Sequence, residues 1–148
     1  MQATKPNQTA IRVWVERFFI GIVLFLNLQA AIGYIFNPRT YLGSFELEGT
    51  PATAALAGTG ILFAMWQVPY CFAVVNPVKY KTSLVEAVLM QAIGLIGETW
   101  LRTRIEPAHT ILRGSLLRFI IFDAGGLVLL LIAFLLVHIG QSKTKSLE

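Results

Sequence analysis

Six polar or charged side chains interrupt long apolar stretches of this sequence, and they are its best candidates for chemistry. Glu98 and Asp123 are acids that could accept a hydrogen bond or donate a proton, and two arginines would balance their charge. Two amide side chains could orient a bound molecule. Polar groups within apolar surroundings are costly unless they find partners, so we expect the six to lie together. They are Asn27, Gln91, Glu98, Arg102, Arg118 and Asp123.

The composition of the chain indicates what surrounds these residues. Of the 148 residues, 55% are hydrophobic and only 14% are charged, and the mean hydropathy is +0.66. Soluble domains carry about 25% charged residues. A small domain has too much surface to cover with so few charges. The composition therefore argues against a soluble enzyme or a disordered chain and predicts an integral membrane protein.

Four apolar runs are long enough to be membrane spans, which need about 20 residues each. Pro-containing or charged segments separate them, and Pro69 predicts a kink inside the second run. We therefore expect an all-α protein, an antiparallel bundle of four transmembrane helices in one domain over residues 11–140. Polar tails are expected at 1–10 and 141–148. The predicted spans are 11–36, 54–75, 83–101 and 115–139.

Helical spacing predicts where the six candidates lie. Gln91, Glu98 and Arg102 follow a helical repeat and share one stripe of the third span. Asp123 lies about 12 Å inside the fourth span at 1.5 Å per residue. Asn27 lies at a similar depth in the first span. The cluster is therefore expected in the half of the bundle that faces the first and third loops.

A purely structural role for the cluster is an open alternative. Asp123 could form an interhelical ion pair with Arg102 or Arg118, and Glu98 could pair with Arg102 one turn away. Both arginines could also extend to the lipid headgroups. The remaining alternatives are a ligand pocket and the handling of protons or ions.

Other polar and small residues have simpler interpretations. Glu16 stands beside an arginine near a span end, which indicates an interfacial position. Gln67 belongs to a stripe of small residues that includes Gly60, so it is predicted to hydrogen bond across a helix interface. Gly125 and Gly126 also indicate close packing between helices.

Several classes of site have no sequence support. The chain has no HExxH, Walker, GxSxG or CxxC motif, and Cys71 is its one cysteine. His109 and His138 are expected near the membrane interface. We therefore predict no metal and no cofactor. The basic residues are scattered between apolar runs, which argues against a nucleic-acid partner.

The distribution of basic residues predicts the orientation in the cell membrane. Four spans put both termini on one side, and cytoplasmic loops carry an excess of Lys and Arg. The terminal side has seven and the other side five, so both termini are expected in the cytoplasm. The seven are Lys5, Arg12, Arg17, Lys79, Lys81, Lys143 and Lys145, and the five are Arg39, Arg102, Arg104, Arg113 and Arg118.

Residues 11–104 resemble the DoxX-like superfamily of small four-helix bacterial membrane proteins. The matching features are Arg17-Phe-Phe-Ile-Gly21 in the first span, Asn37-Pro38 before a glycine-containing loop, and the small residues of 54–60. The resemblance implies a compact antiparallel bundle, and some members are linked to quinone or thiol redox metabolism. The lack of paired cysteines argues against thiol chemistry here. The resemblance transfers no functional residue.

The leading functional hypothesis is non-enzymatic. A small multi-pass protein would bind an apolar or lipid-like molecule, or a membrane-protein partner, through a polar-lined bundle interior. One alternative is a membrane enzyme or redox subunit that acts on a lipid or quinone through an intramembrane carboxylate. Another is a proton-coupled small-molecule transporter, which would have to work as a homo-oligomer because four helices enclose little room.

Overall fold

The computed structural model describes the backbone of residues 6–145 and the side chains of residues 10–140, and all of its regular elements are helices. This confirms the predicted all-α bundle. The long helices are α1 (Pro6–Phe36), α3 (Gly49–Trp66), α5 (Lys81–Arg104) and α6 (Thr110–Lys145). The shorter elements are α2 (Pro38–Leu42), the 3-10 turn η1 (Gly43–Phe45) and α4 (Val68–Val75).

Four segments are long and apolar enough to cross a membrane. They are Ala10–Phe36, Gly49–Val75, Lys81–Arg104 and Thr110–Gly140. Large apolar side chains are exposed on the outside of the bundle, Phe25 and Ile93 among them, whereas Glu16 and Gln91 are buried. Such a distribution suits lipid as the surrounding solvent. The chain is a small polytopic membrane protein with four candidate spans.

The helices continue further than the predicted spans. Residues 6–10 belong to α1 and 141–145 to α6, although both segments were predicted as tails. Residues 1–5 and 146–148 of those tails lie outside the described residues. Inside the second span the helix is interrupted at Gln67, two residues before Pro69, because proline cannot donate the next backbone hydrogen bond. The helix is therefore interrupted where Pro69 predicted a departure from a regular span.

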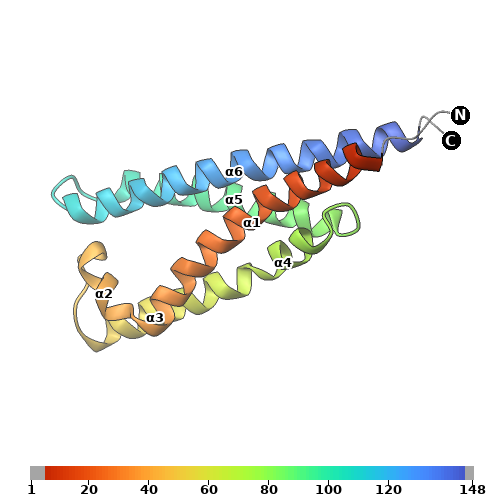
Figure 1. Ribbon diagram of the computed structural model, residues 1–148. Helices are drawn as coiled ribbons and strands as arrows, with labels where there is room; N and C mark the ends of the chain where they lie inside the picture. The colour runs from red at the N-terminus through yellow and green to blue at the C-terminus, as the bar shows by residue number, and fades with distance from the viewer. Residues whose placement is uncertain (1–5, 146–148) are drawn as a thin grey trace, which may run out of the picture.

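The bundle has the shape of a V (Figure 1). The α5–α6 pair and the α1–α3 pair diverge toward the loops that follow α1 and α5, and they converge toward the chain termini. We call these two parts the loop half and the terminal half. Buried apolar side chains fill the terminal half. They are Ile20, Val23, Tyr70, Ala73, Leu84, Ala87, Leu130, Ala133 and Val137.

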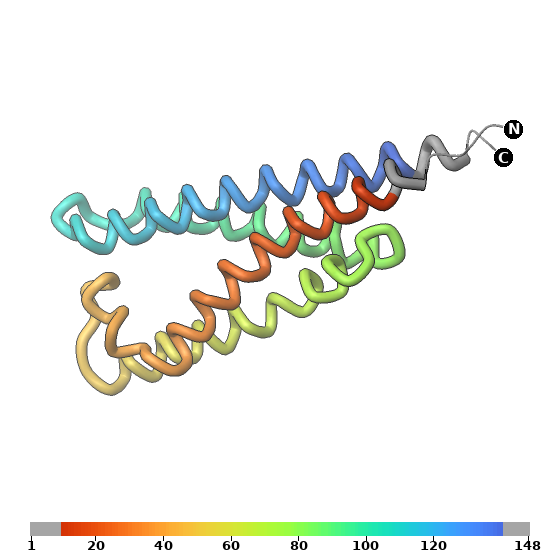
Figure 2. Tube along the Cα trace, in the orientation of Figure 1, coloured from red at the N-terminus to blue at the C-terminus, as the bar shows by residue number. Residues whose placement is uncertain are grey.

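Residues 37–48, which we call the strap, cross the open end of the V (Figure 2). The strap begins with α2, where Pro38 takes a first-turn position that suits proline. η1 then contacts α6 on the other arm of the V. The strap turns back at Glu46, which has a left-handed backbone with φ 54°, and α3 follows at Gly49 with φ 82°. The strap thus joins the two arms of the bundle.

Candidate functional site

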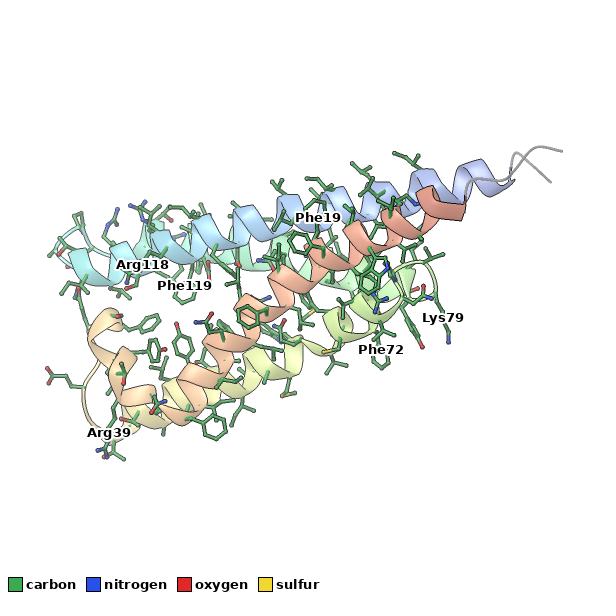
Figure 3. The ribbon with its side chains drawn as sticks, viewed as in Figure 1. Phe19, Arg39, Phe72, Lys79, Arg118 and Phe119 are labelled. Atoms are coloured by element: carbon green, nitrogen blue, oxygen red, sulfur yellow. The ribbon has the colours of Figure 1, made fainter. Side chains whose placement is uncertain are left out.

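A cavity of about 480 Å³ lies in the loop half, between α1, α3, α5 and α6, with the strap at one end. Most of its wall is aromatic or apolar, and a few polar groups reach into it. Arg118 and Phe119 lie on the loop half of α6 (Figure 3). The polar lining residues are Asn27, Gln29, Ser44, Gln67, Gln91, Glu98, Ser115, Arg118 and Asp123.

Aromatic rings form a continuous series of contacts around the cavity. Tyr34 on α1 is the centre, with its ring 5.0 Å from that of Tyr41 and 6.0 Å from that of Phe63 on α3. Phe45 of the strap lies 6.0 Å from Tyr34 and is stacked at 6.0 Å on Phe119 of α6. These contacts form an aromatic wall of the cavity that extends from α3 across α1 and the strap to α6.

A hydrogen-bond network forms the polar floor of the cavity. The Tyr70 hydroxyl lies 2.8 Å from Gln91 Oε1 and 3.1 Å from the Ala87 carbonyl oxygen, and the Asn27 side chain is close enough for a further hydrogen bond. Gln91 Nε2 donates to Asp123 Oδ1 at 2.7 Å. The network therefore connects one residue from each of α1, α4, α5 and α6.

Asp123 and Glu98 extend this network, because their carboxyl groups are close enough for a hydrogen bond between them. Two carboxyl oxygens can share a hydrogen bond only when one group carries a proton. The result is a carboxyl pair at the meeting of α5 and α6. Such a pair can accept donors from a bound molecule or hold a proton.

Two glycines make room for these polar side chains. A Cβ at Gly94 on α5 would overlap the Asp123 carboxylate from α6. Conversely, a Cβ at Gly126 on α6 would lie 2.8 Å from Gln91 Nε2 of α5. The prediction of close packing is thus met at Gly126 but not at Gly125, where an added Cβ would meet nothing within 4 Å. Each of the two helices supplies a polar side chain and, through its glycine, the space for the polar side chain of the other helix.

Five of the six candidate residues line the cavity, namely Asn27, Gln91, Glu98, Arg118 and Asp123. Arg102 is not among the lining residues. Its Nε donates to the Arg113 carbonyl oxygen at 3.3 Å, and Arg113 Nη1 returns a bond to the Arg102 carbonyl oxygen at 3.1 Å. Arg102 and Arg113 therefore join the end of α5 to the start of α6, and the carbonyl groups at the C-terminal end of α5 attract the Arg113 cation.

The ion pairs expected for the acids do not form. Among residues 10–140, the ion pairs join Arg12 to Glu16 and His109 to Glu46. Arg118 instead donates from Nη2 to Ser115 Oγ at 2.7 Å, and that hydroxyl donates to the Ser44 carbonyl oxygen at 2.5 Å. Arg118 thus connects α6 to the strap rather than neutralising Asp123.

Two buried acceptors at the cavity have no hydrogen-bond partner in the part of the chain that the structure describes: Gln67 Oε1 and Glu98 Oε2. Gln67 is only 5% exposed. It was predicted to bond across a helix interface, but its Nε2 donates to the Phe63 carbonyl oxygen of its own helix at 3.0 Å. The helix interruption before Pro69 places Gln67 on the cavity wall instead.

Glu46 fastens the strap to the start of α6, an arrangement that the sequence did not indicate. Its Oε1 accepts the backbone N–H groups of Ile111 and Leu112, each at 3.1 Å, and its Oε2 lies 2.5 Å from His109 Nδ1. Its carboxylate also complements the positive end of the α6 dipole. The His109 hydrogen bond and these amide bonds lower the pKa of Glu46.

Glu16 was predicted at the membrane interface, and the structure places its side chain inside the bundle. Its side chain is 0% exposed and forms an ion pair with Arg12 at 3.2 Å. The pair lies in the terminal half, away from the cavity. The sequence showed only the neighbouring charges, and it did not show that other helices would cover this face of α1.

No family model, curated protein or solved structure matches the chain. Within the described residues, no group of three or more His, Cys, Asp or Glu side chains is placed to hold a metal ion. The function must therefore be argued from the cavity itself.

Proposed function

We propose that this protein binds an amphiphilic, lipid-like small molecule in the cavity of the loop half. The observation that carries the proposal is a cavity of about 480 Å³ whose walls are aromatic and whose floor is polar. Ligand pockets commonly measure about 300–1,000 Å³ and combine apolar walls with a few polar groups that fix orientation. Tyr34, Phe45 and Phe63 would contact the apolar body of the ligand, and Glu98 and Asp123 would meet its polar group.

The surroundings of the cavity favour a ligand that comes from the bilayer. α3 packs on α1, and α5 packs on α6, so the walls belong to two diverging helix pairs. The strap contacts α6 at the loop end through Ser44 and Phe45. An amphiphile could therefore enter sideways between α3 and α5.

The orientation and relationships of the protein belong to the same proposal. The excess of basic residues favours both termini in the cytoplasm, which would place the cavity in the opposite leaflet. A reporter fused to the C-terminus that works only in the cytoplasm should be active. A DoxX-like relationship fits the four-span topology and would be supported by a relative of known structure that shares it.

Native mass spectrometry after gentle extraction tests the proposal. We expect a bound small molecule on the wild-type protein and none on Ala30→Phe, because Ala30 lines the cavity and a benzyl group would fill part of it. The matched control is Ala54→Phe, an exposed position on α3, which should retain the molecule. Equal occupancy of the two variants would contradict binding in the cavity.

A further inference from the structure

The hydrogen-bond donors and acceptors of the cavity differ in whether they have partners within the described part of the protein. The donors of Gln91, Tyr70 and Gln67 all reach acceptors within the protein. In contrast, Gln67 Oε1 and Glu98 Oε2 are buried acceptors for which residues 10–140 provide no donor. An unsatisfied buried acceptor costs free energy, and a ligand that supplies a donor recovers it.

The charge and the aromatic walls of the cavity favour the same kind of ligand. Two acids and one arginine line the cavity. Arg118 is exposed, bonds to Ser115, and lies five residues from Asp123, about 7.5 Å along the helix axis. The faces of aromatic rings carry partial negative charge and attract cations. Tyr34, Phe63 and their neighbours therefore make this a favourable apolar site for an organic cation.

From these two observations we infer that the ligand is a lipophilic amine, bound as the ammonium form. Its N–H groups donate to the Glu98–Asp123 carboxyl pair and to Gln67 Oε1, and its apolar body lies among the aromatic rings. This inference rests on the proposed function, and it adds the chemical class of the ligand. The ammonium group supplies the missing donors, and the ionised member of the carboxyl pair balances its charge.

Three probes of similar shape separate the contributions of charge and of N–H donors. They are 6-phenylhexylamine, its N,N,N-trimethyl derivative, and hexylbenzene. Trp66 lines the cavity, so a Trp14→Phe, Trp100→Phe background would let its fluorescence report binding in nanodiscs. We expect the amine to bind about tenfold tighter than the trimethyl derivative, because only the amine donates hydrogen bonds, and hexylbenzene to bind weakest.

Variants connect this preference to the two acceptors. Gln67→Met removes Oε1 at similar side-chain length and should reduce the preference for the amine about tenfold, with hexylbenzene binding unchanged. Thr99→Val is the control, because Thr99 is exposed on α5, bonds back to the Leu95 carbonyl oxygen and does not line the cavity, and it should retain the preference. Glu98→Gln should weaken binding of both cations and leave hexylbenzene unaffected.

The outcomes of these experiments separate the amine inference from the proposed function, which is the binding of a lipid-like molecule in the cavity. Equal binding of all three probes, abolished by Ala30→Phe, would overturn the amine inference and leave ligand binding intact. A preference for the amine that survives both Gln67→Met and Glu98→Gln would also overturn it. If none of the probes binds and native mass spectrometry finds no ligand, the proposed function fails as well.

Discussion

The two halves of this bundle differ in what occupies their interior, although the same four long helices form both. In the terminal half the interior is filled by closely packed apolar side chains, among them Ile20, Leu84 and Leu130, which are fully buried. In the loop half the helix pairs diverge around a cavity with polar groups, and the strap joins the two arms. Lipid is as apolar as leucine, so packing and hydrogen bonds must hold the helices together. The terminal half relies mainly on packing, although Arg17 Nε donates to the Val74 carbonyl oxygen at 2.9 Å, and the loop half adds a network of hydrogen bonds to its aromatic contacts.

The largest expected effect comes from a cavity made in the terminal half. Leu130→Ala should lower the free energy of unfolding by about 2 kcal/mol, near the low end for such changes because lipid also solvates a leucine well. The matched change in the loop half is Leu26→Ala, since Leu26 lines the existing cavity and is 40% exposed. It should cost less than about 0.5 kcal/mol. Thermal unfolding in detergent measures both, and equal losses would contradict a division into a packed and an open half.

The general architecture followed from the sequence because the signals for it are local. Apolar runs of span length, Pro69 inside the second run, and helical spacing on the third each depend on neighbouring residues alone. The same arithmetic placed Asn27 and Asp123 at similar depths, and helical spacing placed Gln91 and Glu98 on one stripe of the third span. Depth and helical face are enough to bring such residues into one half of a bundle.

Other features depend on how helices meet, which no local pattern records. Glu46 and His109 are 63 residues apart in the sequence. The aromatic contacts of Tyr34 require α3 and the strap to be placed first. Gln67 turned into the cavity only because the helix is interrupted beside it, and Glu16 became buried only because other helices cover it. In each case the missing information was the packing of distant segments.

The next effect concerns the polar floor, where the two halves meet. Tyr70→Phe removes the hydroxyl that lies within hydrogen-bond distance of Gln91 Oε1 and the Ala87 carbonyl oxygen, at a cost of about 1 kcal/mol. The ring remains, so packing in the terminal half should be preserved. Tyr80→Phe, at the turn before α5, is the control and should change stability little. A neutral Tyr70→Phe would show that the network adds nothing to the stability of the junction.

A smaller net effect on stability is expected from Gly94→Ala, which tests the role of close packing at the cavity. The new methyl group would displace the Asp123 carboxylate and weaken its bond from Gln91, while alanine favours the helix by about 1 kcal/mol. The two contributions nearly offset each other, so stability should change by less than about 1 kcal/mol. Gly97→Ala, which meets open space, should gain the full helix preference. If both variants gain the same stability, the space at Gly94 does not help to position the Asp123 carboxylate.

The smallest effect is expected at the exposed attachment of the strap, where pH provides the test. The hydrogen bonds to Glu46 lower the pKa of this group, so the folded protein favours its ionised form. The resulting stabilisation is present above the ordinary pKa of glutamate, about 4.3, and is lost as the pH falls through the lower folded value. Hydrogen exchange of the strap amides, corrected for intrinsic rates, should therefore show weaker protection at pH 3 than at pH 6. Glu46→Gln should remove this difference and Glu48→Gln should keep it, whereas a step that persists in Glu46→Gln would assign the pH response to another group.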